Sequence, residues 1–131
     1  MATTRLIPLH MGKGRNFGKA IRNVIGYVSN PKKTHQGELV TCFGCNPETA
    51  DGEFLLMKRE YIAQTGRRRG KDDVIAYHLR QSFVPGEITP EEANRIGCEL
   101  ASRFTHGQHA YVVATHEDRQ HVQYVLCKGR F

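Results

Sequence analysis

The sequence predicts an α+β domain in which about three helices pack against a mainly antiparallel sheet of about five strands. Two alternating apolar segments near the end of the chain are joined by a short corner, so they are expected to pair antiparallel. Three other segments carry apolar residues at helical spacing, and strand-like segments separate them. The predicted order is therefore β-α-β-α-β-α-β-β.

The length of 131 residues indicates one domain spanning residues 1–131. The hydrophobic content of 39% and the charged content of 24% are typical of soluble globular proteins. No run of about 18 apolar residues is present, so no membrane span is predicted. The first ten residues lack the apolar core of a signal peptide. We therefore expect a cytoplasmic protein.

The first strand is predicted at Thr4–His10, where Pro8 indicates an edge position or a bulge. Asn16 can cap a helix from about Phe17 to Val28. Ser29-Asn30-Pro31 should end this helix, because the residue before a proline disfavours the helical conformation.

A short strand is predicted at Gly37–Cys45, followed by a second helix at roughly Thr49–Gln64. Gly66 should end that helix, and Arg67–Lys71 is expected to form an exposed basic loop.

The alternation of Asp73–Phe83 is the clearest strand signal. Thr89 and Pro90 then open a third helix, as N-cap and first helical residue, and the helix should reach about Phe104. Its expected buried stripe is Ala93, Ile96, Leu100, Ala101 and Phe104.

The last two strands, Tyr111–Ala114 and His121–Leu126, enclose a polar corner at Thr115–Gln120. The corner and the start of the second strand carry two imidazoles and two carboxylates: His116, Glu117, Asp118 and His121. Such groups at a strand–turn–strand junction can hold a divalent metal ion, because rigid strands fix the directions of the ligands.

The net charge is +6 and the isoelectric point is near 9.4. Basic residues cluster in three places, and such clusters attract polyanions, of which nucleic acid is the commonest in a cytoplasm. The candidate contacts are Lys13, Arg15, Lys32, Lys33, Arg67, Arg68, Arg69 and Lys71. An exposed, merely solvated loop is the alternative interpretation of the arginine run.

Four cysteines are present, and without a signal peptide we expect reduced thiols. Cys42 and Cys45 have the CxxC spacing of half a zinc site or a redox pair. Because Cys98 and Cys127 stand alone, we favour two small residues near a turn. His35, His106 and His109 fall in predicted loops and receive no role.

Several of these segments together resemble a known family. Residues 115–126, THEDRQHVQYVL, are similar to the third motif of the mobilisation relaxases (Mob/VirD-type), of the histidine–hydrophobic–histidine endonuclease class. Residues 27–34, YVSNPKKT, resemble the family segment Y-x-x-N-P-x-K-T. Residues 73–83 and 86–93 resemble the strand and helix between these motifs. The resemblance covers essentially the whole chain and implies a relaxase-like fold.

The resemblance implies a function in mobilising a conjugative plasmid or transposon. Tyr27 would be the nucleophile and Asp118 the catalytic carboxylate, while His116 and His121 would bind a divalent metal, Mg²⁺ or Mn²⁺. The partners implied are single-stranded or origin DNA and other relaxosome proteins, with no membrane. The same comparison predicts a domain that is truncated after the motif strand.

The chain departs from the family pattern after His121, where Gln123 and Val125 replace histidines. Valine cannot bind a metal, and glutamine offers one neutral oxygen, so weaker metal binding is expected. His78, on a neighbouring predicted strand, is a candidate substitute. The alternatives are an active nickase, a DNA-binding remnant or accessory protein without a metal cofactor, and a small α+β protein whose charge is incidental.

Overall fold

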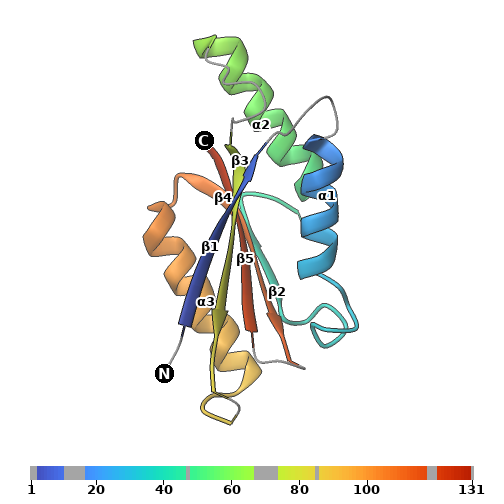
Figure 1. Ribbon diagram of the computed structural model, residues 1–131, viewed down its shortest axis with the longest axis vertical. Helices are drawn as coiled ribbons and strands as arrows, with labels where there is room; N and C mark the ends of the chain where they lie inside the picture. Colours follow the sequence, from blue (N-terminus) through green and yellow to red (C-terminus); the bar gives the residue numbers. More distant parts are fainter. Residues whose placement is uncertain are drawn as a thin grey trace.

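The computed structural model describes residues 3–10, 17–46, 48–66, 74–84, 86–117 and 121–130. It has eight elements in the predicted order (Figure 1). The strands are β1 (Thr3–His10), β2 (Val40–Phe43), β3 (Val74–Ser82), β4 (His109–His116) and β5 (His121–Arg130). The helices are α1 (Phe17–Val28), α2 (Ala50–Thr65) and α3 (Pro90–Thr105).

The five strands form one sheet in the order β1-β3-β5-β4-β2, and every neighbouring pair is antiparallel. The predicted α+β class and element order are therefore confirmed. β1 lies at one edge of the sheet and has an irregular register at Leu9/His10, which agrees with the interpretation of Pro8. β5 lies at the centre, so it is hydrogen-bonded on both sides.

Helices cover both faces of the sheet. Figure 1 shows α1 and α2 on one side and α3 on the other. Ile21, Ile25 and Phe54 from α1 and α2 pack with Val112 and Val125 of the sheet. A second core joins α3 to the opposite face, with Ala93, Ala101, Val113, Val122, Tyr124 and Leu126 among its members. Because side chains alternate along a strand, β4 and β5 contribute to both cores.

Helix α3 begins as predicted. The Thr89 hydroxyl accepts a hydrogen bond of 3.2 Å from the backbone N–H of Glu92, and Pro90 occupies the first turn. The predicted stripe is partly wrong, since Phe104 is 60% exposed and Gly97 is buried instead. A Cβ at Gly97 would lie 2.7 Å from Val122 Cγ1, so the absent side chain lets α3 approach the sheet closely.

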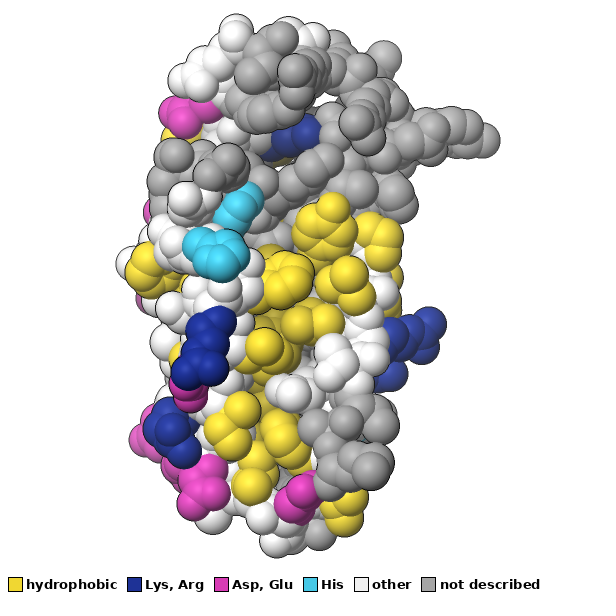
Figure 2. All heavy atoms as spheres, turned by 90° about the vertical axis from the view of Figure 1, so that its left-hand side faces the viewer, with side chains coloured by type: hydrophobic (Ala, Val, Ile, Leu, Met, Phe, Trp, Pro, Cys, Tyr) yellow, Lys and Arg dark blue, Asp and Glu magenta, His cyan; other side chains and the backbone are white. Residues whose placement is uncertain are grey.

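The face that carries α3 is not fully covered. The helix packs on β4, β5 and β2, while Leu6 of β1 faces the same side as Leu79 of β3 and is half exposed. Figure 2 shows hydrophobic side chains gathered in a band over this side of the molecule. Phe104 is among the large apolar side chains exposed to solvent.

Three predicted strands have the wrong bounds. β4 runs from His109 to His116 rather than from Tyr111 to Ala114, so His109 is not in a loop and Thr115 and His116 belong to the strand instead of the polar corner. The short strand occupies Val40–Phe43 rather than 37–45, because residues 31–39 form a turn region in which His35, Gln36 and Gly37 all have positive φ. The last strand continues to Arg130 instead of ending at Leu126, since Cys127 still pairs with Ala76 of β3.

Candidate functional site

The segment after α1 folds into a hydrogen-bonded turn. The Asn30 side-chain oxygen accepts from the backbone N–H of Lys32 at 3.0 Å, and the Asn30 carbonyl accepts from the Thr34 hydroxyl at 2.9 Å. This Asx turn follows from the sequence Asn-Pro, because proline fixes its own φ and the asparagine side chain caps the turn. Thr34 is fully buried, so its side chain anchors the turn to the protein interior.

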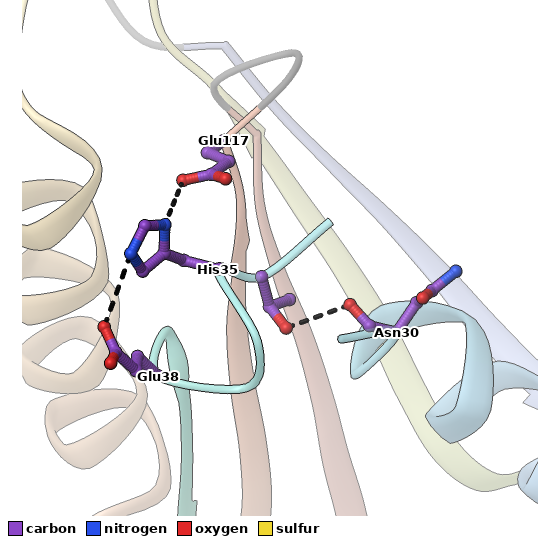
Figure 3. Close-up of polar contacts among 5 residues, drawn as sticks. Asn30, His35, Glu38 and Glu117 are labelled. Atoms are coloured by element: carbon purple, nitrogen blue, oxygen red, sulfur yellow. Dashed lines mark hydrogen bonds and ion pairs between the residues drawn. The ribbon is translucent and has the colours of Figure 1, made fainter. Parts of the chain in front are cut away.

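The same turn is attached to the end of β4. The backbone N–H of Glu117 donates to the Lys33 carbonyl at 3.0 Å, and that of Thr115 donates to the Leu39 carbonyl at 3.0 Å. Figure 3 shows His35 between two carboxylates. Its Nδ1 lies 3.3 Å from Glu117 Oε2 and its Nε2 lies 3.6 Å from Glu38 Oε2. His35, which received no role from the sequence, therefore joins the turn to the motif corner.

These attachments bring the predicted nucleophile to the first motif histidine. The rings of Tyr27 and His116 pack edge to face, with 5.4 Å between their centroids and an interplanar angle of 73°. Tyr27 is 47% exposed, whereas His116 is only 2% exposed. At the end of α1, the exposed Tyr27 ring thus contacts the buried His116 ring.

His116 is oriented by the backbone of α1. Its Nε2 lies 2.9 Å from the Val28 carbonyl oxygen. Because a carbonyl only accepts, Nε2 carries the hydrogen, and in the neutral imidazole Nδ1 then carries the lone pair. A metal-binding histidine commonly donates its second ring nitrogen to a carbonyl in this way. The arrangement fits a metal ligand.

The second predicted ligand lies beside the first. His116 of β4 is directly opposite His121 of β5, so both imidazoles are on the face covered by α1 and α2. Gln123 lies two residues further along the same face, opposite Ala114, and is 1% exposed. Its side-chain Oε1 lies 2.7 Å from Nε2 of His78 on β3.

The candidate metal donors on this face are therefore two imidazoles and one amide oxygen. Among the described residues no three His, Cys, Asp or Glu side chains cluster closely enough to hold a metal ion. Two imidazoles with an oxygen donor nevertheless suit divalent first-row metals. Val125 lies on the same face and belongs to the hydrophobic core, as its aliphatic side chain requires.

The predicted basic residues divide into two groups. Lys33 places its Nζ 4.7 Å from the centre of the Tyr27 ring, close enough for a cation–π contact, and Lys32 is exposed in the same turn. Lys13, Arg15, Arg67, Arg68, Arg69 and Lys71 lie outside the described residues. The predicted carboxylate Asp118 also lies outside them.

The CxxC pair lies away from this site, at the end of β2. All four cysteines are free thiols. A hydrogen bond with the Cys45 thiol lowers the pKa of Cys42, although burial acts in the opposite direction. The same bond, together with burial, raises the pKa of Cys45. Cys45 also contacts the Tyr111 carbonyl at 3.5 Å, so the pair is part of the packing around β4.

Comparison with known proteins identifies the class to which this fold and site belong. The family model for the nuclease domain of MobA/VirD2-like relaxases matches residues 27–124, from the exposed tyrosine to the middle of β5. The chain belongs to this family of relaxase nuclease domains. Such domains generally depend on a divalent metal ion and bind DNA at an origin of transfer.

Curated relatives agree with this assignment. The group II intron-interrupted relaxase LtrB of Lactococcus lactis subsp. cremoris (strain MG1363) is 34% identical over 121 residues, covering 78% of this chain and 22% of that protein. A protein rlx of Staphylococcus aureus is 46% identical over 122 residues, covering 92% of this chain and 31% of that protein. The chain thus spans less than a third of the length of these relatives.

No solved structure gives a significant match to the chain. Within the described part of the chain, no helix combines the length and the apolar character that crossing a membrane would require.

Proposed function

We propose that this chain is the DNA-nicking domain of a relaxase, which binds transfer-origin DNA as a single strand and cleaves it through Tyr27. The observation that carries the proposal is the contact between Tyr27 and His116, with 5.4 Å between ring centroids. A nucleophile must be reachable by the DNA backbone, and the half-exposed Tyr27 meets this condition. A metal ligand must be fixed, and the buried, hydrogen-bonded His116 meets that one.

The reaction is a transesterification. The Tyr27 hydroxyl oxygen attacks the phosphorus, a new phosphorus–oxygen bond forms, and the bond to the 3′ oxygen breaks. The 5′ phosphate stays on the tyrosine, so the energy of the phosphodiester is kept for religation. Asp118 takes the phenol proton in this scheme, and the leaving 3′ oxygen takes a proton from water.

His116, His121 and Gln123 would hold the metal ion, Mg²⁺ or Mn²⁺. When bound, that ion supplies positive charge that polarises the scissile phosphate. The chain's own residues do the rest. The Val28 carbonyl orients His116, and the Asn30–Thr34 turn presents Lys33 beside the tyrosine. Lys33 and the exposed Lys32 supply positive charge for DNA phosphates bound beside Tyr27.

The test uses single-stranded oligonucleotides tiled across the transfer origin of the element that carries the gene. The chain is incubated with each labelled strand and Mn²⁺, and covalent complexes are separated on a denaturing gel. The wild type should form a 5′-phosphotyrosyl adduct at one position, and Tyr27→Phe should form none. Tyr77→Phe is the matched control, because Tyr77 packs with the core under α3, on the opposite face of the sheet.

Two results would count against the proposal. An adduct that persists in Tyr27→Phe would move the nucleophile elsewhere. Salt-sensitive binding without any adduct, with either metal, would leave a DNA-binding protein that has lost the chemistry, as the replacement of two motif histidines by Gln123 and Val125 allows.

A further inference from the structure

His78 and Gln123 form a polar pair inside the sheet face covered by α1 and α2. The side chains come from neighbouring strands, 45 residues apart in sequence, and Nε2 lies 2.7 Å from Oε1. His78 is directly opposite Val125, so it reaches Gln123 diagonally across the strands. Gln123 is buried and His78 is half-buried, and a buried amide among apolar residues is retained only if its hydrogen bonds are satisfied.

The direction of this hydrogen bond follows from the atoms. A side-chain amide oxygen only accepts, so Nε2 of His78 must carry the hydrogen and donate it. A ring nitrogen that carries a hydrogen has no lone pair for a metal ion. His78 therefore does not replace the missing imidazoles through Nε2. Gln123 Oε1 has two lone pairs, and the bond from His78 uses one of them.

The sheet register shows what surrounds Gln123. On this face, His116 and Ala114 of β4 stand opposite His121 and Gln123 of β5, giving a square of four positions. Opposite Cβ atoms in such a pair are about 5 Å apart, and residues two apart along a strand are separated by about 7 Å. Ala114 contributes only a methyl group at its corner. Within these four positions, no other large side chain separates Gln123 from the two imidazoles.

We propose that His78 is a positioning residue that holds Gln123 as the third metal ligand beside His116 and His121. The hydrogen bond distinguishes the two ends of the amide, because only the oxygen can accept from His78. It also removes most of the rotamer freedom of the glutamine side chain before the ion arrives. This inference rests on the proposed function, since it assumes that the site binds a divalent ion.

The test measures metal affinity without DNA. Mn²⁺ is titrated into the chain by calorimetry for the wild type, His78→Phe, Gln123→Met and the double variant. Loss of a partner that orients a ligand typically weakens metal binding by about 10- to 100-fold. We expect His78→Phe to show a loss in that range and Gln123→Met to weaken binding as well. In the Gln123→Met background, His78→Phe should have little further effect.

His78→Gln is the matched control, because its amide N–H can still donate to Gln123 and should restore part of the affinity. Thermal unfolding of the metal-free variants separates a folding defect from a binding defect. A second measurement uses the wild type alone: ¹⁵N NMR of the His78 ring should show hydrogen on Nε2 both before and after Mg²⁺ is added. Neither readout depends on nicking.

The outcomes separate the inference from the function on which it rests. If the wild type binds Mn²⁺ and His78→Phe binds equally well or more tightly, the positioning role of His78 is wrong, whereas the nicking proposal stands. Loss of the Nε2 hydrogen on addition of metal would also overturn it and make His78 a ligand. If the wild type forms the Tyr27 adduct but binds no divalent ion, the metal site and the role of His78 both fail while the tyrosine chemistry remains.

Discussion

The Nε2 atom of His116 lies 2.9 Å from the carbonyl oxygen of Val28, the last residue of helix α1. The last carbonyls of a helix have no partner within the helix, so a donor from elsewhere must satisfy them. Here the donor comes from the end of β4, 88 residues later in the chain. This one hydrogen bond therefore satisfies the last carbonyl of α1 and also fixes the orientation of the His116 ring.

His116→Phe should destabilise the fold. The substitution removes the donor and leaves the Val28 carbonyl unpaired in a buried place, which typically costs about 1–3 kcal/mol. Urea unfolding followed by circular dichroism gives the free energy of unfolding. His116→Gln keeps an N–H donor and should recover part of the loss. Equal urea midpoints for all three proteins would mean that the bond contributes nothing to stability.

Lys33→Met should weaken single-stranded DNA binding and slow adduct formation more than Lys32→Met does. The Lys33 ammonium lies 4.7 Å from the Tyr27 ring centre, whereas Lys32 is an exposed residue of the same turn. Each lost phosphate contact should reduce the slope of log affinity against log salt by about 0.7. Adduct formation at saturating DNA separates the two residues, because Lys33 contacts the ring of Tyr27, the proposed nucleophile. Identical rates for the two variants would place Lys33 among ordinary backbone contacts.

Gly97→Ala should destabilise the domain by about 1–3 kcal/mol, because an added methyl group overpacks the core. It would lie 2.7 Å from Val122 Cγ1 and 3.0 Å from Val113 Cγ1. Gly52→Ala in α2 is the matched control, since nothing lies within 4 Å of its Cβ position. Alanine is the better helix former, so the control should unfold at an equal or higher temperature. A similar melting temperature for both variants would show that α3 can move away from the sheet.

Cys42 should be alkylated faster in the wild type than in Cys45→Ala. The thiol of Cys45 stabilises the Cys42 thiolate and lowers its pKa, whereas burial opposes this effect. A lower pKa means more thiolate at a given pH, so removing the Cys45 thiol should raise the pKa and slow the reaction. Iodoacetamide labelling between pH 7 and 9, followed by peptide mass spectrometry, gives the rates. Cys98, on helix α3, serves as the internal reference. Faster labelling in Cys45→Ala would mean that burial, not the hydrogen bond, dominates.

Local signals in the sequence predicted most of the fold. The order of elements, the cap at Thr89 and the edge position of β1 all depend on neighbouring residues, and all are confirmed. The prediction that Phe104 is buried is wrong. Helical periodicity shows which residues share a face of the helix, but it does not show where the surface packed against that face ends. Phe104 lines an open hollow with Tyr77 and Leu126 of the sheet and is 60% exposed.

The site was predictable only in part, and for a related reason. The family resemblance selected Tyr27 and His116, but their contact depends on the turn at Asn30–Thr34 and its attachment to β4. The pairing of His78 with Gln123 depends on the register of β3 against β5, which alternation along one strand does not determine. Contacts between distant strands require the assembled sheet.

The central position of β5 has a consequence for the order of events during synthesis. β3 and β4 do not pair with each other; each pairs with β5, which is translated after both. While β5 is still inside the ribosome, the emerged chain has only the β1–β3 and β2–β4 pairs and lacks His121 and Gln123. Non-local pairing of this kind slows folding. Under the proposed function, the candidate metal ligands His116, His121 and Gln123 therefore come together only after the central strand has been inserted, and nicking waits for the sheet to be completed.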